Sequence, residues 1–222
     1  MFYKILSSYI EKNSNPKITF LSGWGQRSDI INLDKFSKKV EYLDYLFHTS
    51  VDPVFDDLKS QNPDIIIGWS LCGIIAINSI VKQITKPKLL ILLATPFQFL
   101  SQDSYKIGVG PEIYQSFNNH LSKNPEKLLR KFHLMMLQDD KRFLELKNKF
   151  TYSQNFDNLQ YWLDYLINFS ALNLNFNNFC QTELIYGEND KIVNLEQGKL
   201  FNQKILNSQF HLVKKSSHIP FL

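Results

Sequence analysis

The sequence predicts an α/β fold, with a mostly parallel twisted sheet, flanking helices and an inserted helical cap. Three observations support this prediction. Short, almost continuously apolar runs are typical of strands buried on both faces of a parallel sheet. Helical patterns alternate with these runs in the first and last parts of the chain, as in a doubly wound sheet. Between these parts, residues 103–175 contain helical patterns without strands.

Four apolar runs predict strands clearly, and two predict them more weakly. The clear strands are expected over 17–22, 64–68, 88–94 and 182–187, and the weaker ones over 40–47 and 210–213. Helices are expected over 71–84, directly after the second clear strand, and over 195–205, before the last strand. These elements assign residues 1–102 and 176–222 to one sheet domain.

The interrupting block, residues 103–175, forms the predicted cap. Its helices are expected over 111–121, 125–137, 141–150 and 158–170. Ligands bind at the carboxyl edge of open α/β sheets, so we expect the cap to cover that edge.

The composition is that of a folded soluble protein, with 44% apolar and 21% charged residues. No run of about 18 apolar residues predicts a membrane span. The first ten residues lack the apolar core of a secretory signal. Two cysteines cannot form a disulfide framework, which favours the cytoplasm. The net charge of +4 comes without a nucleic-acid-binding motif, and we expect a monomer.

The strongest functional signal is a Gly-x-Ser step between a buried strand and an apolar helix, in Ile65–Gly73. This context predicts a nucleophile elbow, the strained turn that presents a serine at a helix N-terminus. Ser70 would be the nucleophile, Gly68 would leave room for the turn, and the N–H of Leu71 would point toward an oxyanion. Cys72 stands where the pattern usually has glycine, and a serine that only caps the helix is the simpler alternative.

The base is expected after the last strand, because the chain order in such sites is serine, acid, histidine. His218 follows the last predicted strand, and a loop there can bring its imidazole over Ser70. A surface histidine is the alternative. Three other histidines follow the elbow and fit less well: His120, His133 and His211.

The acid is expected after the strand over 182–187, where Gly187 is followed by a turn that contains Asp190. Its carboxylate would accept an N–H from His218 and stabilise the imidazolium without taking the proton. Glu188 is the competing carboxylate, and a turn aspartate without a catalytic role is the alternative.

A second oxyanion donor is expected from Ser22–Gly25, which ends the first clear strand. Glycines on both sides of Trp24 let the backbone approach a ligand closely. We therefore expect the N–H of Trp24 to be the second oxyanion donor, beside the N–H of Leu71. A glycine-rich loop that is filled by an apolar indole is the alternative, and many hydrolases of this class have histidine at the position of Ser22.

These features predict the α/β-hydrolase fold and resemble one family within it. The Gly-Trp-Gly loop at 23–25, the elbow at 68–73 and the His-Ile-Pro-Phe segment at 218–221 are similar to motifs of the pimeloyl-acyl carrier protein (ACP) methyl ester carboxylesterases of biotin synthesis. Cys72 departs from the family's Gly-Trp-Ser-Leu-Gly-Gly elbow. The chain also stops soon after His218, where relatives usually continue into a helix.

The resemblance implies a serine esterase that needs no metal or cofactor and releases methanol from an acyl chain carried by ACP. Carrier proteins are acidic, and residues 121–150 contain eight Lys or Arg against four Asp or Glu, so this region is expected to dock the carrier. The basic residues assigned to docking are Lys123, Lys127, Arg130, Lys131 and Arg142. The first four are expected to share one face of an amphipathic helix; a solvated helix face is the alternative.

An apolar channel for the acyl chain is expected from aromatic residues near the elbow and in the cap: Trp69, Phe97, Phe99, Tyr114 and Trp162. Packing in the core is the alternative for each. Two other functions stay open. The first is a different hydrolase, such as a general carboxylesterase or an acyl thioesterase. The second is a non-catalytic binding protein with the same fold.

Overall fold

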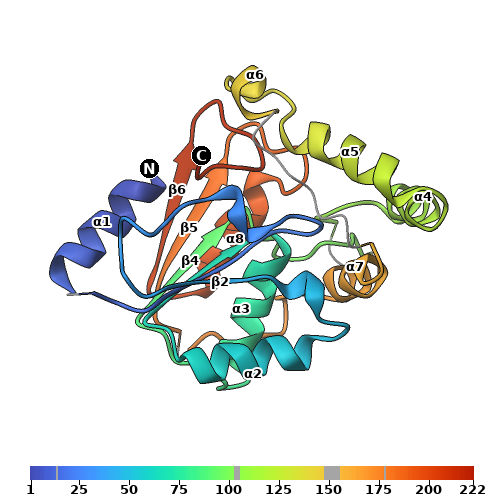
Figure 1. Cartoon of the computed structure of the whole chain (residues 1–222). Coiled ribbons are helices and arrows are strands. Elements are labelled where there is room, and N and C mark those ends of the chain that lie inside the picture. Colours follow the sequence, from blue (N-terminus) through green and yellow to red (C-terminus); the bar gives the residue numbers. More distant parts are fainter. Residues whose placement is uncertain (14, 103–105, 148–155, 178) are drawn as a thin grey trace.

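The structure is a computed structural model, and it describes residues 1–13, 15–102, 106–147, 156–177 and 179–222. Within these ranges, six strands form one sheet in the order β2-β1-β3-β4-β5-β6, and every neighbouring pair is parallel (Figure 1). The strands are β1 (Ile18–Leu21), β2 (Val40–Leu43), β3 (Ile65–Trp69), β4 (Leu89–Leu93), β5 (Gln181–Gly187) and β6 (Ser208–Val213). Each corresponds to a predicted strand.

Among the described residues, four α-helices belong to the predicted sheet domain: α1 (Phe2–Lys12), α2 (Val51–Gln61), α3 (Leu71–Val81) and α8 (Leu195–Lys204). The helices α3 and α8 confirm predictions, whereas α1 and α2 were not expected. Figure 1 shows α1 on one side of the sheet and the α2–α3 pair on the other. The apolar residues of α2 recur at helical spacing and are buried, so the sequence did carry a signal for this helix: Val51, Val54, Phe55 and Leu58.

The predicted cap contains α4 (Pro111–Lys123), α5 (Pro125–Met136), α6 (Phe143–Leu146) and α7 (Leu159–Ile167). Figure 1 shows α4, α5 and α6 beyond the arrowheads of the strands. The helix expected over 141–150 is shorter in its described part. Its last residues, 148–150, and the predicted start of the cap at 103 lie outside the described residues. No helix in the described ranges is long and apolar enough to cross a membrane.

A break between α4 and α5 corrects one expectation. Asn124 ends α4 and begins α5, where its side chain accepts a hydrogen bond from the N–H of Lys127. Pro125 follows at the first helical position, which suits a helix start and prevents continuation of the preceding helix. Lys123 therefore ends α4 and does not share a helix with Lys127.

The central strands β3 and β4 are buried along their whole length, as expected for the middle of a covered parallel sheet. Because all strands run parallel, their carboxyl ends meet at one edge. Four loops leave that edge after β1, β3, β5 and β6. These loops carry Trp24, Ser70, Asp190 and His218 respectively.

Candidate active site

The backbone at Ser70 has the strained geometry of an elbow. Ser70 lies between the last residue of β3, Trp69, and the first residue of α3, Leu71. Its φ is 52° and its ψ is −118°, a region that a non-glycine residue occupies only when the surrounding structure imposes it. The N–H of Ser70 donates to the carbonyl of Leu93 on β4, at 2.8 Å, and this bond helps to hold the turn. The predicted strand–turn–helix context is therefore present.

Two glycines of the elbow, residues 68–73, are required by close contacts. A Cβ on Gly68 would lie 2.7 Å from the Cα of Gly73, and one on Gly73 would lie 1.9 Å from Oγ1 of Thr95. Cys72, which departs from the usual glycine, is fully buried, and burial raises the pKa of its thiol well above the ordinary value. A protonated, buried thiol is a poor nucleophile, so Cys72 is a packing residue.

Ser70, His218 and Asp190 lie in hydrogen-bonded succession. Nε2 of His218 is 3.0 Å from Oγ of Ser70, and Nδ1 of His218 is 2.8 Å from Oδ2 of Asp190. The side chains of His218 and Asp190 are 1% and 0% exposed. Oδ1 of Asp190 also accepts the N–H groups of Ile192 and Val193, at 2.8 and 2.9 Å. The carboxylate is thus held by its own turn, and it can keep a proton on Nδ1 while Nε2 faces the serine.

The competing residues have other partners. Glu188 is exposed and accepts the N–H of Lys215 at 2.8 Å. His211 pairs with Glu183 at 2.6 Å. His133 is buried on α5, where desolvation lowers its pKa to about 4. Asp190 and His218, and none of these three residues, form the hydrogen-bonded succession with Ser70.

The loop that carries Trp24 is held by a tyrosine that sequence analysis missed. The hydroxyl of Tyr45 accepts the N–H of Gly25 at 3.0 Å and donates to the carbonyl of Gly23 at 2.8 Å. The peptide units on both sides of Trp24 are fixed in this way. Tyr45 lies in a short 3-10 helix (Tyr45–Phe47) after β2, the strand next to β1, and no local sequence signal connects it with this loop.

The indole of Trp24 links the same loop to the cap. Its Nε1–H donates to the carbonyl of Leu159, the first residue of α7, at 3.1 Å. Its ring lies 5.4 Å, between centroids, from the rings of both Phe117 and Phe132. The hydroxyl of Ser22, at the position where many hydrolases have histidine, donates to a backbone carbonyl of the loop at 2.7 Å.

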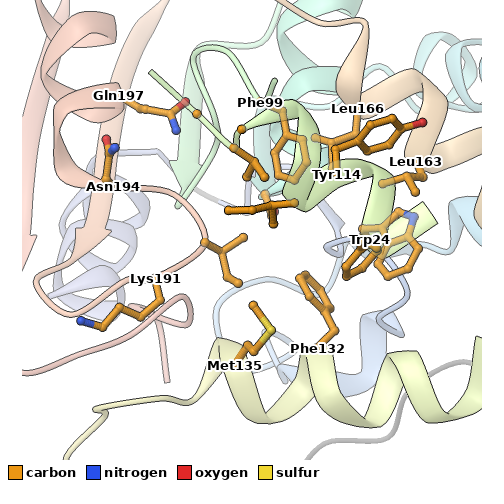
Figure 2. A pocket seen from close by; sticks show the side chains of 17 residues that line it. Trp24, Phe99, Tyr114, Phe132, Met135, Leu163, Leu166, Lys191, Asn194 and Gln197 are labelled. Carbon is orange, nitrogen blue, oxygen red and sulfur yellow. The ribbon is translucent and has the colours of Figure 1, made fainter. Parts of the chain in front are cut away.

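An apolar cavity of about 310 Å³ opens beside Ser70 (Figure 2). Phe99 and Tyr114 line it, as expected for the channel, and so does Trp24, whose expected role was that of an oxyanion donor. Most residues of the cavity wall were not predicted. They are Gly108, Val109, Gly110, Ile113, Phe117, Phe132, Met135, Leu163, Leu166, Lys191, Ile192, Asn194 and Gln197. Figure 2 shows the polar members Lys191, Asn194 and Gln197 grouped on one side and aromatic rings on the other.

No family model matches the chain, but comparison with curated proteins finds relatives. A pimeloyl-[acyl-carrier protein] methyl ester esterase of Wigglesworthia glossinidia brevipalpis is 25% identical, over 100% of this chain and 92% of its own length. The corresponding esterase of Legionella pneumophila (strain Paris) is 24% identical, over 75% of this chain and 68% of its own.

Solved structures share the architecture. An esterase from Exiguobacterium antarcticum superposes with a TM-score of 0.76 at 14% identity, covering 92% of this chain and 85% of that one. A hydrolase from Oleispira antarctica gives 0.73 at 14% identity, covering 93% and 85%. This chain has the α/β-hydrolase fold. Together with the named activity of the curated relatives, the fold places the protein among the carboxylic ester hydrolases.

Three predicted substrate contacts of this hydrolase lie outside the cavity wall. The indole of Trp69 is fully buried and donates to the carbonyl of His218 at 2.9 Å. Phe97 is buried against another aromatic ring in the core. Trp162 is also buried, and its Nε1–H donates to the carbonyl of His48 at 3.1 Å. We do not retain these three as substrate contacts, because size and apolarity alone do not separate a cavity wall from the core.

The predicted docking residues divide into two groups. Lys123, Lys127, Arg130 and Lys131 are exposed on α4 and α5 of the hydrolase. The side chain of Arg142 is only 18% exposed and makes an ion pair with Asp140 at 2.9 Å, so it is not placed to receive a partner.

In the described part of the chain, no group of three or more His, Cys, Asp or Glu side chains could hold a metal ion.

Proposed function

We propose that this hydrolase is a serine carboxylesterase that converts the methyl ester of pimeloyl-ACP to pimeloyl-ACP and methanol, in biotin synthesis. The observation that carries the proposal is the succession of Ser70, His218 and Asp190 at the wall of an apolar cavity. The names of the curated relatives supply the substrate.

The first half of the reaction acylates the serine. Oγ of Ser70 attacks the ester carbonyl as its proton passes to Nε2 of His218, and Asp190 stabilises the imidazolium. The N–H groups of Trp24 and Leu71 are the proposed donors to the oxyanion, and one such donor is typically worth about 3 kcal/mol. The imidazolium then protonates the departing methoxide, and methanol leaves an acyl-serine.

The second half frees the acid. A water molecule gives its proton to His218 and attacks the acyl carbon of the ester on Ser70. The tetrahedral intermediate collapses, the imidazolium returns the proton to Oγ of Ser70, and the carboxylic acid leaves. The mechanism uses no metal or organic cofactor.

The cavity suits the apolar part of the proposed substrate. The methylene chain of the pimeloyl group can lie against side chains such as Phe99, Val109 and Leu163, which line the cavity. The carrier, which is acidic, would approach the exposed basic residues of α4 and α5, and opposite charge would steer this encounter.

A substrate panel with the Ser70→Ala variant tests the reaction. The wild type should release methanol from methyl pimeloyl-ACP, and the folded variant should lose about 10,000-fold or more in kcat. Near-normal turnover by the folded variant would refute the role of Ser70. A preference for acyl thioesters would favour a thioesterase, and a preference for short p-nitrophenyl esters would favour a general carboxylesterase. Failure to react with a fluorophosphonate probe would favour a non-catalytic binding protein.

Charge reversal tests the docking face. Replacing Lys127, Arg130 and Lys131 by glutamate should reduce kcat/KM for the carrier-bound ester about tenfold or more, because the approach of the acidic carrier is no longer favoured. Hydrolysis of a small soluble ester should stay within about twofold. An equal loss on both substrates would contradict docking. The matched control makes the same change in charge at exposed lysines outside the cap: Lys12, Lys38 and Lys59.

A further inference from the structure

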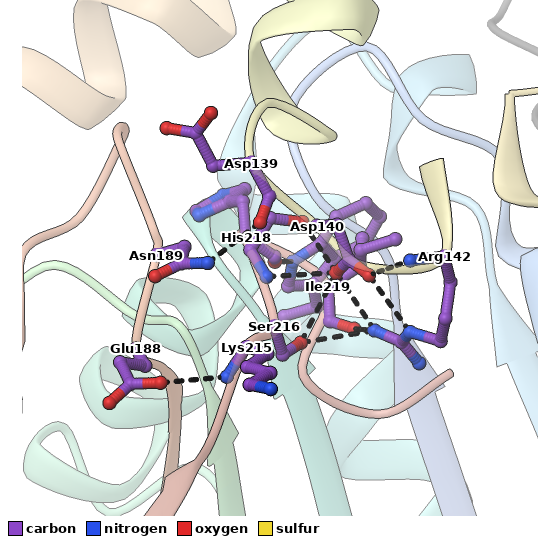
Figure 3. A network of polar contacts seen from close by, with 11 residues as sticks. Asp139, Asp140, Arg142, Glu188, Asn189, Lys215, Ser216, His218 and Ile219 are labelled. Atoms are coloured by element: carbon purple, nitrogen blue, oxygen red, sulfur yellow. Dashed lines mark hydrogen bonds and ion pairs between the residues drawn. The ribbon is translucent and has the colours of Figure 1, made fainter. Parts of the chain in front are cut away.

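A buried ion pair lies beside the loop that carries His218 (Figure 3). Oδ1 of Asp140 accepts both the N–H and the Nε–H of Arg142 at 2.9 Å, and Oδ2 accepts Nη2–H at 2.9 Å. The side chain of Asp140 is 0% exposed and that of Arg142 is 18% exposed. A guanidinium that binds a carboxylate through two nitrogens is a strong and directional contact. These residues, called here the Asp140–Arg142 pair, lie between α5 and α6.

The pair also binds the histidine loop, residues 214–219, immediately before His218, and Nη2 of Arg142 donates to the carbonyl of Ile219 beyond it at 3.4 Å. Oδ2 of Asp140 accepts the N–H and the hydroxyl of Ser217, at 2.9 and 3.0 Å. Nη2 of Arg142 donates to the hydroxyl of Ser216 at 3.0 Å. The residues that immediately precede His218 in the chain are therefore held by the pair.

The peptide groups of His218 itself are held by two other segments. Its N–H donates to the carbonyl of Met136, the last residue of α5, at 3.2 Å. Its carbonyl accepts the indole N–H of Trp69, the residue next to Ser70, at 2.9 Å. The backbone of His218 thus bridges the elbow and the end of α5, and the Asp140–Arg142 pair fixes the adjoining residues.

The carboxylate of Asp140 stays ionised over a wide pH range. Burial raises its pKa, but the hydrogen bonds and charge of Arg142, together with the N–H of Ser217, outweigh burial and bring the pKa to about 2. An ionised acceptor that binds several donors at once is a rigid support for a backbone segment.

We infer that the Asp140–Arg142 pair positions the catalytic histidine, by setting the histidine loop so that the imidazole of His218 meets both Ser70 and Asp190. This inference rests on the proposed function. The pair touches neither substrate nor reacting atoms, so both members are positioning residues. Displacement of a catalytic group by about 1 Å can reduce the rate as much as 100-fold, so a small movement of this loop is enough to matter.

The Asp140→Asn variant tests the inference, with Asp64→Asn as the matched control. Asp64 also accepts a backbone N–H, that of Lys17 at 3.0 Å, and pairs with Lys88 at 2.9 Å. It precedes β3, so it lies at the opposite end of the sheet from the elbow. For a small soluble ester, Asp140→Asn should lower kcat about 10- to 100-fold with KM within about twofold, whereas the control should change both less than about twofold. Equal kinetics in the two folded variants would overturn the inference.

The His218→Ala background separates positioning from general damage. Residues that act through one group are non-additive, so Asp140→Asn should change the residual rate of His218→Ala by less than about twofold. The same fold loss in both backgrounds would mean that the pair acts on stability and not through the imidazole, and this would overturn the inference.

Two further measurements keep the test decisive if Asp140→Asn does not fold or if no ester is hydrolysed. Arg142→Lys keeps the positive charge but loses the planar guanidinium group that binds both carboxylate oxygens, and should lower kcat about 3- to 10-fold. An unchanged kcat would contradict positioning. Hydrogen exchange of the amides at 214–219 should accelerate about tenfold in Asp140→Asn, or in Arg142→Lys, and not in Asp64→Asn. Hydrogen exchange tests the contact between the pair and the loop without any substrate. A failure of the inference can therefore be distinguished from a failure of the proposed esterase activity.

Discussion

The elbow and the histidine loop support the same site in different ways. The elbow is a continuous stretch between β3 and α3, and its shape follows from a buried strand, two required glycines and the start of a helix. The histidine loop depends on contacts with Trp69, Met136 and Asp140, which are far away in the chain. Ser70 is therefore placed by local backbone geometry, whereas His218 is placed by tertiary contacts.

The largest expected effect tests whether the two regions form one catalytic unit. Ser70→Ala and His218→Ala should each lower kcat about 10,000-fold or more, and the double variant should lose no more than either single one. Steady-state kinetics on one ester, with thermal unfolding as the check of folding, measure this. A double variant whose loss equals the product of the two single losses would show that the residues act independently.

The next effect tests the local character of the elbow. Gly68→Ala should reduce the free energy of unfolding by roughly 3 kcal/mol, because the new Cβ meets backbone atoms that cannot turn aside. Gly110→Ala is the control, since a Cβ there meets nothing within 4 Å and φ is −64°. It should stay within about 0.5 kcal/mol of the wild type. Denaturant unfolding compares the two, and equal values would contradict the close packing of the elbow.

The acid stability of the hydrolase tests the tertiary character of the histidine loop. The pKa of Asp140 is lowered from 3.8 to about 2, so its contribution to stability is present above about pH 4 and is lost as the pH falls toward 2. The wild type should lose roughly 1–2 kcal/mol over this window relative to Asp140→Asn, which has no group to protonate there. Denaturant unfolding between pH 4 and 2 measures the difference, and parallel curves would contradict it.

The smallest effect tests the bond that joins the two regions. Trp69→Phe removes the indole N–H that binds the carbonyl of His218, and should cost about 1 kcal/mol of stability and lower kcat several-fold. Trp162→Phe removes a similar bond, to His48, and should cost a similar amount with kcat unchanged. Equal kcat in the two variants would mean that the Trp69 bond supports the fold only.

The same division explains what the sequence could predict. The strands β1, β3, β4 and β5 were clearly predictable because β-branched and leucine-rich runs mark buried parallel strands. The edge strands β2 and β6 are only partly buried, so their signal was weaker. The elbow was predictable because strand, Gly68, Ser70 and apolar helix are contiguous. Asp190 and His218 followed from the order in which such residues occur along the chain.

Residues that act across the chain were missed or misassigned. Tyr45 holds the Trp24 loop from the short 3-10 helix that follows β2, and no local pattern indicates this. Arg142 was expected to be a docking residue, since its charge is visible in the sequence while its burial against Asp140 is not. Trp69 and Trp162 were expected to line the cavity as large aromatic residues. Each is instead buried in the core, where its indole N–H donates to a backbone carbonyl.

The replacement of glycine by Cys72 gives the hydrolase an internal reporter. The sulfur is fully buried directly after the turn, and its raised pKa leaves almost no thiolate at neutral pH. Iodoacetamide can therefore alkylate it only in molecules whose α3 has separated from the sheet. Cys180 is only partly exposed and burial also raises its pKa, to about 11, so Cys180→Ser is the background for this measurement. The labelling rate of Cys72, relative to that of the unfolded chain, would then measure how often the region beneath Ser70 opens in otherwise native protein.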